Sequence, residues 1–193
     1  EDLESGEAHL KELRIVSTNN SVGPHKPGIP TDLPSPMTIA NQTAITWEQD
    51  PDTRLQLVRQ LASRSDRQMA GDLAYILLED EDPLIRRNAA IGLGKIRVSA
   101  AKDALILALS DNDFLVRKRA VHALGKTWGH NAIEPLGEVL LSDPDPRIRR
   151  DAALKLGRIF SEDAYRALEI AQSEPEAHVR RAIMAGLERL EDY

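Results

Sequence analysis

The sequence of 193 residues contains no cysteine. Disulfide bonds, thiolate metal ligands and cysteine nucleophiles are therefore excluded. The absence of cysteine does not identify the cellular compartment, because a secreted protein can also lack cysteine. No apolar run reaches the roughly 18 to 20 residues that cross a bilayer, so we expect no membrane insertion and a cytoplasmic protein.

Aromatic residues are also scarce, at 4% of the chain against a hydrophobic content of 41%. A core must then be built from Leu, Ile, Val and Ala, which suits closely stacked helices better than a β-sandwich. The net charge of −6 is uneven, because residues 1–48 carry seven acids and three bases. The remainder of the chain is nearly neutral, which argues against a dedicated nucleic-acid-binding protein.

A repeat of about 31 residues fills the chain after this acidic start. Four segments align without gaps, and a fifth copy, which begins at Asp50, is more divergent. All five share one arginine at the same place, at Arg54, Arg86, Arg117, Arg149 and Arg180. The spacings between these arginines are 32, 31, 32 and 31 residues. Such regularity indicates a repeat architecture, in which each unit packs on its neighbours.

Each repeat is expected to be a pair of helices joined by an acidic turn. Helices that carry the shared arginine are expected over 83–96, 114–127, 146–159 and 177–190, each after an Asp or Glu that can cap it. Second helices are expected over 67–79, 98–110, 131–141 and 161–172. Gly94, Gly125 and Gly157 recur near helix ends, where glycine permits either close helix contact or a stop. We predict at least nine helices and no sheet.

The segments Asp82-Pro-Leu-Ile-Arg-Arg-Asn-Ala-Ala-Ile-Gly-Leu-Gly-Lys-Ile and Asp145-Pro-Arg-Ile-Arg-Arg-Asp-Ala-Ala-Leu-Lys-Leu-Gly-Arg-Ile carry a family resemblance. They resemble the HEAT-like repeat, in the short form of phycobilisome lyases and many bacterial scaffold proteins. The resemblance covers residues 48–190 and implies an all-α protein, an α-solenoid of about five helix pairs. The last copy departs from the pattern, with Glu188 in place of glycine, as expected for an end unit.

Residues 1–37 are expected to form an N-terminal tail, and residues 38–193 the repeat domain. Five of the eleven prolines fall within residues 17–36, which excludes a helix there. This segment could be a flexible linker, a cap on the first repeat or an extended strap on a neighbouring subunit. The strap is our prediction, with Ile29, Leu33 and Met37 as its anchors.

The shared arginines Arg54, Arg86, Arg117, Arg149 and Arg180 are expected to form a structural ladder. Acids recur in the turns before these helices, and a guanidinium group can serve two acceptors at once. We therefore expect each arginine to bond turn carboxylates of its own or of an adjacent unit.

A second series of bases follows the ladder by one residue. In the resembled family these helices line the concave side, so a basic concave surface and an acidic outer surface are implied. A solvated charged face is the plain interpretation, and a site for an acidic protein segment is the functional one. Nucleic acid is not expected, because no aromatics interleave with the bases. The predicted partner-binding residues are Arg87, Ile91, Lys118, His122, Arg150, Leu154 and Arg181.

No catalytic or metal site can be assembled from the sequence. The five histidines form no i, i+4 pair and no His-Glu pair, on which HEAT-repeat iron hydroxylases depend. Gly-Leu-Gly-Lys at residues 92–95 lacks the full spacing of a phosphate-binding loop. We therefore expect no cofactor, no metal and no enzyme activity.

The predicted function is a non-catalytic scaffold or assembly subunit in a hetero-complex. It would bind another protein, with an acidic or amphipathic segment, through its concave face and its N-terminal strap. The alternative rests on the repeat type alone. It is a bilin lyase-type subunit that handles a tetrapyrrole chromophore.

Overall fold

A computed structural model describes residues 50–64 and 66–191. The described residues form nine α-helices and no strand, which confirms the predicted all-α fold. The α-helices are α2 (Pro51–Arg64), α3 (Ala70–Glu79), α4 (Pro83–Leu93), α5 (Ser99–Leu107), α6 (Phe114–Thr127), α7 (Ile133–Ser142), α8 (Pro146–Leu156), α9 (Glu162–Ile170) and α10 (Ala177–Glu191). Short 3-10 helices are η2 (Arg67–Met69), η3 (Ala108–Ser110), η4 (Gly129–Ala132) and η5 (Ala171–Ser173).

The predicted tail, with its anchors Ile29, Leu33 and Met37, lies outside the described residues. So do residues 38–49, the start of the expected repeat domain. None of the described helices combines the length and the apolar character needed to cross a membrane.

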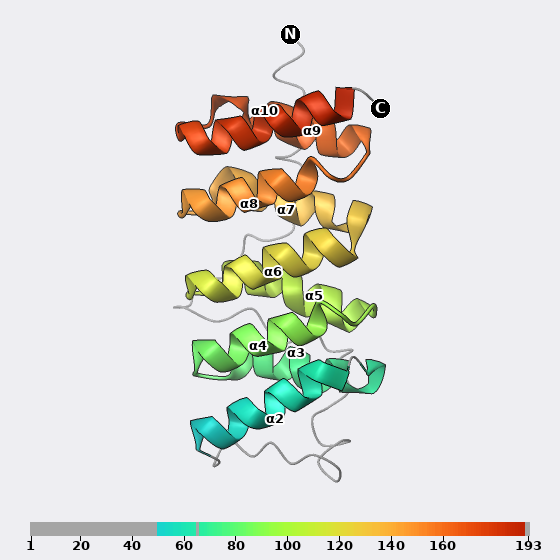
Figure 1. Cartoon of the computed structure of the whole chain (residues 1–193), viewed down its shortest axis with the longest axis vertical. Coiled ribbons are helices and arrows are strands. Elements are labelled where there is room, and N and C mark those ends of the chain that lie inside the picture. The colour runs from blue at the N-terminus through green and yellow to red at the C-terminus, as the bar shows by residue number, and fades with distance from the viewer. Residues whose placement is uncertain (1–49, 65, 192–193) are drawn as a thin grey trace, which may run out of the picture.

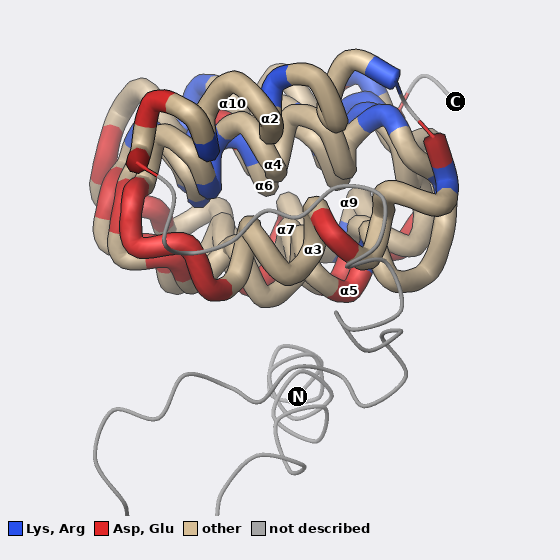
Figure 2. Tube along the Cα trace, turned by 90° about the horizontal axis from the view of Figure 1, so that it is seen from below, with Lys and Arg blue, Asp and Glu red and all other residues tan. Residues whose placement is uncertain are grey.

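The helices form two layers (Figure 1). One layer contains α2, α4, α6, α8 and α10, here called the B helices, and neighbours in this layer pack against each other. The other layer contains α3, α5, α7 and α9, the A helices. The turns from A to B helices gather along one edge of the stack (Figure 2), so the B helices all run in the same direction. This arrangement is an α-solenoid.

Local sequence signals explain where the B helices begin. Asp82, Asp113 and Asp145 each take the N-cap position and accept a backbone N–H of the first turn with a side-chain oxygen. Pro83 and Pro146 follow at the first helical positions, where a missing N–H has no cost. These caps agree with the sequence expectation.

Two B helices end earlier than expected, α4 at Leu93 and α8 at Leu156, with Gly94 and Gly157 as their C-caps. Both glycines have ordinary right-handed φ angles, −62° and −64°, so backbone freedom does not explain them. Space does. A Cβ on Gly157 would lie 2.6 Å from Cα of Gly186, and one on Gly94 would lie 2.8 Å from Cβ of Ala123.

Close approach of this kind recurs between successive B helices, and we call these contacts the junctions. The junction pairs are Ala62 with Gly92, Gly94 with Ala123, Gly125 with Lys155, and Gly157 with Gly186. Every pair includes at least one glycine, whose missing Cβ leaves room for the facing chain. In α10 the residue at the position of Gly94, Gly125 and Gly157 is Glu188.

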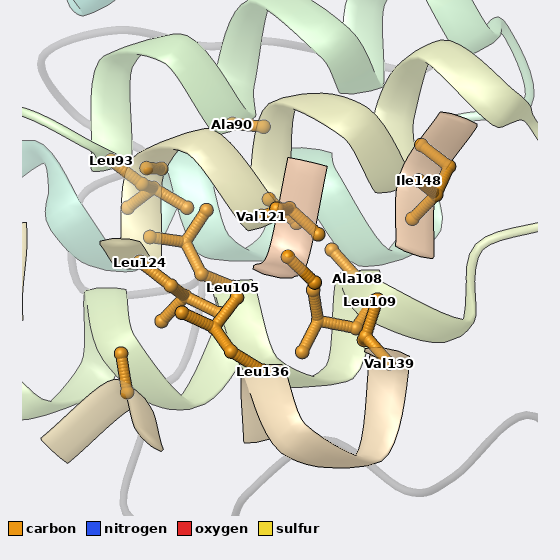
Figure 3. Close-up of a cluster of buried hydrophobic side chains, with 14 of the residues drawn as sticks. Ala90, Leu93, Leu105, Ala108, Leu109, Val121, Leu124, Leu136, Val139 and Ile148 are labelled. Atoms are coloured by element: carbon orange, nitrogen blue, oxygen red, sulfur yellow. The ribbon is translucent and has the colours of Figure 1, made fainter. Parts of the chain in front are cut away.

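The core lies between the two layers and runs without a break from Val58 to Leu187. Figure 3 shows its middle, where Leu105 and Leu136 of the A helices meet Leu93, Val121 and Leu124 of the B helices. The fully buried hydrophobic side chains are all aliphatic, as the composition predicts. Burial of each large aliphatic side chain contributes about 1.5–3 kcal/mol to folding.

Candidate functional site

The arginine ladder joins each unit to the next through the A-to-B turns. Arg86 donates from Nε and Nη2 to the two carboxylate oxygens of Asp111, at 2.8 Å each. Its Nη1 donates to the carbonyl oxygens of Asp80 and Glu81, in the turn before its own helix. One guanidinium group therefore ties two successive turns together.

The same pattern recurs along the stack. The ion pairs are Arg54–Asp80, Arg86–Asp111, Arg117–Asp143 and Arg149–Glu174, with closest N–O distances of 2.7–3.1 Å. Each of these acids also accepts a backbone N–H from the residue two positions later. The acids are almost fully covered, Asp80 and Asp143 being 1% and 6% exposed. The bond to Arg149 lowers the pKa of Glu174 below its ordinary value.

Arg180 of α10 is the exception. Its Nη1 donates to the carbonyl oxygens of Glu174 and Pro175, as the other ladder arginines do in their own turns. No carboxylate within the described part of the chain pairs with it. Among the described residues, Arg180 is thus the ladder arginine without an acid partner.

The outward side of the B helices carries a repeating pattern, and we call this surface the B-helix face. It consists of four residues from each of α4, α6, α8 and α10, and in α4 and α8 the fourth residue lies just after the end of the helix. The third position is apolar except at His122, the first is apolar in α4 and α6, and the second and fourth are basic throughout. The four residues in chain order are Leu84, Arg87, Ile91 and Lys95; Leu115, Lys118, His122 and Lys126; Arg147, Arg150, Leu154 and Arg158; His178, Arg181, Ala185 and Arg189.

Charge separates between the two layers (Figure 2). The formal charges of α2, α4, α6, α8 and α10 are +2, +2, +4, +3 and +1. Those of α3, α5, α7 and α9 are −2, 0, −2 and −2. The B-helix face is therefore basic, and the A helices with the turn edge are acidic.

The structure places all seven predicted partner-binding residues on the B-helix face, and none of them is buried. Lys118, His122 and Arg150, from α6 and α8, come together. Their side chains are 38%, 45% and 42% exposed, and Leu154 beside them is 40% exposed. The other three lie on neighbouring or terminal helices, Arg87 and Ile91 on α4 and Arg181 on α10.

Asp151 lies between Lys118, His122 and Arg150 and contacts all three. The sequence analysis did not predict Asp151 as a site residue. Its carboxylate lies 3.3 Å from Nε2 of His122, 3.2 Å from Nη2 of Arg150 and 3.7 Å from Nζ of Lys118. The Asp151 side chain is only 7% exposed. The sequence did contain a signal for Asp151, because it is the one acid in the basic helix α8. The residues at the same position of α4, α6 and α10 are Asn88, Arg119 and Ala182, and none of them is acidic.

The cluster around Asp151 works through hydrogen bonding and charge. Burial lowers the pKa of His122, and the positive charge of Lys155 lowers it further, while the bond to Asp151 opposes both. Because the Asp151 carboxylate can only accept, Nε2 of His122 is the donor in the bond between them. Within the described ranges, no group of three or more His, Asp or Glu residues is arranged to hold a metal ion.

Comparison with known proteins identifies the repeat. Residues 42–125 and 102–188 match the family model for HEAT repeats. The solved structure of human deoxyhypusine hydroxylase in complex with glycerol is similar, with a TM-score of 0.59 and 27% sequence identity. The match covers 66% of this chain and 45% of that chain, so this chain spans less than half of the hydroxylase. No protein of curated function matches the sequence. With two overlapping matches to the family model and a two-layer stack of helix pairs, this chain belongs to the HEAT-repeat family.

Proposed function

We propose that this protein is a non-catalytic scaffold that binds an acidic, partly apolar segment of a partner protein across the B-helix face. The observation that carries this proposal is the alternation of basic and apolar positions on successive B helices. A partner lying along the stack would meet one row of cations and, beside it, one row that contains Ile91, His122 and Leu154.

The spacing of these rows restricts the partner. Packed helices lie about 8–10 Å apart, so each row offers one side chain about every 10 Å along the stack. An α-helix advances about 10 Å in seven residues, and an extended chain does so in about three. A partner with acids every seventh residue in a helix, or every third in an extended segment, would match one basic row.

Both kinds of row are needed for useful affinity. Exposed ion pairs contribute about 0.2–1 kcal/mol each, so a few of them hold a partner only weakly. Leu154, at 40% exposure, has apolar surface left to cover. Covering apolar area contributes about 25 cal/mol per Å², so the apolar row must supply much of the affinity. We therefore expect an amphipathic partner rather than a purely acidic one.

The bonds to Asp151 decide which substitutions test this proposal. Reversing Lys118 and Arg150 to Glu would place two carboxylates beside a carboxylate that is 7% exposed, and would destabilise the fold. Neutralisation with Lys118→Gln and Arg150→Gln removes the charge and keeps hydrogen-bonding side chains. Lys102→Gln with Arg166→Gln, on the A helices α5 and α9, is the control with the same charge change.

The binding probe is a synthetic 21-residue amphipathic helix with one Glu row and one Leu row at seven-residue spacing. We expect the Lys118→Gln/Arg150→Gln variant to bind it at least tenfold more weakly, measured by fluorescence anisotropy at low salt. The A-helix control should bind like the wild type. A peptide with Lys in place of every Glu should not bind. Equal loss in both variants would refute the B-helix face as the site.

The tetrapyrrole-handling alternative stays a prediction without a specific observation in its favour. It is tested by visible absorbance of the purified protein after incubation with a bilin. A shifted and intensified band that the Lys118→Gln/Arg150→Gln variant loses would support that alternative over the peptide-binding scaffold.

A further inference from the structure

Among the described helices, α10 presents an exposed face that is covered by the next unit on α4, α6 and α8. In α4, α6 and α8 the ladder arginine is followed, four residues later, by Ala90, Val121 or Ala153, all 0% exposed. The corresponding residue of α10 is Met184, which is 50% exposed. On α4, α6 and α8 the next unit covers the ladder arginine and this apolar residue. On α10 the two corresponding residues, Arg180 and Met184, are both exposed.

Arg180 is already oriented to receive a carboxylate. Its Nη1 is held by the carbonyl oxygens of Glu174 and Pro175, the bonds that Arg86, Arg117 and Arg149 make in their own turns. In those three arginines, Nε and Nη2 both donate to the acid of the next turn. The same two donors of Arg180 have no carboxylate within residues 50–64 and 66–191.

A surface hollow coincides with these residues. It is lined by Ala177, Arg180, Arg181, Met184, Ala185 and Glu188, and its volume is about 500 Å³. Ligand sites in proteins commonly measure about 300–1,000 Å³, so a few residues of a partner fit. Arg181 at its rim adds a second positive charge.

Glu188 limits what can occupy this end. At each inner junction glycine allows the next B helix to approach closely, whereas α10 has Glu188 at that place. A second copy stacked in the same register would bring Gln60 of α2 against Glu188, since Gln60 stands where Gly92 and Gly186 stand. Two long polar side chains cannot pack where the inner junctions use glycine, so continued stacking of the same kind is disfavoured.

We propose that the hollow on α10 is a second binding site, for an acidic turn of a partner protein. An Asp or Glu of that turn would accept two hydrogen bonds from Nε and Nη2 of Arg180, as Asp111 does from Arg86. An adjacent apolar side chain would cover Met184. This site shares Arg181 and Ala185 with the B-helix face, but Arg180 and Met184, which would bind the acid and the apolar side chain, are not part of that face.

The test uses a peptide with the sequence of residues 139–148 of this chain, which includes Asp143, the natural partner of Arg117. The full chain is labelled with ¹³C at its methionine methyl groups and observed by NMR. Met184 reports on the hollow, and Met69, partly buried beside α3, is an internal control. We expect a saturable shift of the Met184 methyl signal, with a Kd below about 1 mM, and no shift for Met69.

Matched variants identify the group responsible. Arg180→Ala should weaken peptide binding at least tenfold, and so should Asn in place of Asp143 in the peptide. Arg166→Ala removes one positive charge from the neighbouring helix α9, outside both the hollow and the B-helix face, and should leave binding unchanged. Circular dichroism of each variant establishes that the helices remain folded.

Three results would overturn the proposal. An unmoved Met184 signal at millimolar peptide means that the hollow does not bind an acidic turn. Equal shifts with the Asp and Asn peptides would show an apolar site without carboxylate recognition. A Met184 shift that depends on protein concentration alone would show that a second copy of the chain covers this end.

Discussion

Replacing Arg117 by alanine in the middle of the ladder should destabilise the whole repeat stack. Arg117 donates to the Asp143 carboxylate at 2.8 and 3.3 Å and to the carbonyl oxygens of Asp111 and Asn112. The Asp143 side chain is 3% exposed, and its remaining described bond is to the N–H of Asp145. The substitution therefore leaves a nearly buried carboxylate with one hydrogen bond.

The expected loss in the free energy of unfolding follows from the Asp143 carboxylate, which the substitution leaves without its ion-pair partner. Breaking a buried ion pair by removing one partner costs about 3–5 kcal/mol. Arg117 is 12% exposed, so its place lies at the edge of the stack and water can enter the vacated space. We expect a loss of about 2–4 kcal/mol in the free energy of unfolding. For a chain of this length that corresponds to a melting temperature lower by about 4–16 °C.

Urea unfolding followed by circular dichroism measures this loss, with two controls on the same kind of helix. Arg180→Ala removes the equivalent arginine where no described carboxylate is paired, and should cost less than about 1.5 kcal/mol. Lys118→Ala, beside Arg117 and 38% exposed, should cost less than about 1 kcal/mol. Equal losses for Arg117→Ala and Arg180→Ala would refute the reasoning, because the carboxylate would then contribute nothing.

Three further predictions concern the junctions, the ladder acids and the tail. Gly157→Ala should destabilise by about 1–3 kcal/mol, because its Cβ would lie 2.6 Å from Cα of Gly186, as measured by thermal melts. Gly137→Ala in α7, where the Cβ would lie 3.6 Å from Ala167, is the control and should be neutral or stabilising. Arg149 lowers the pKa of Glu174 from 4.5, so its contribution is complete above about pH 4.5 and is lost as pH falls through the folded-state pKa. Wild type and Glu174→Gln should therefore differ in urea midpoint at pH 7, and this difference should shrink as the pH falls below 4.5; a constant difference would contradict this. Deletion of residues 1–37 should leave the melting temperature nearly unchanged if this segment is a strap, whereas a large drop would make it a cap on this chain.

The choice of ladder partner shows where sequence reasoning had to leave alternatives open. Four acids, at residues 79–82, precede Arg86, and Asp111 lies one unit further along. Two of the nearer carboxylates are already engaged, because Asp82 caps α4 by accepting the N–H of Leu84, and Asp80 pairs with Arg54. Arg86 reaches the next unit because only there does a carboxylate come within 2.8 Å. Local spacing identified the arginine, and the stacking of units selected its acid.

By itself, the sequence determined the helices, the period of the repeat, the caps and the alternation on the B-helix face. Those features depend on residues within one helix or one turn, so spacing along the chain is enough to find them. Only the tertiary structure decided that Lys118, His122 and Arg150 meet at Asp151. It also decided that Arg180 and Met184 stand uncovered beside Glu188. Both arrangements depend on how far neighbouring helices are offset from each other. The glycine junctions set this offset by close contact, so it cannot be read from the residue spacing within a single unit.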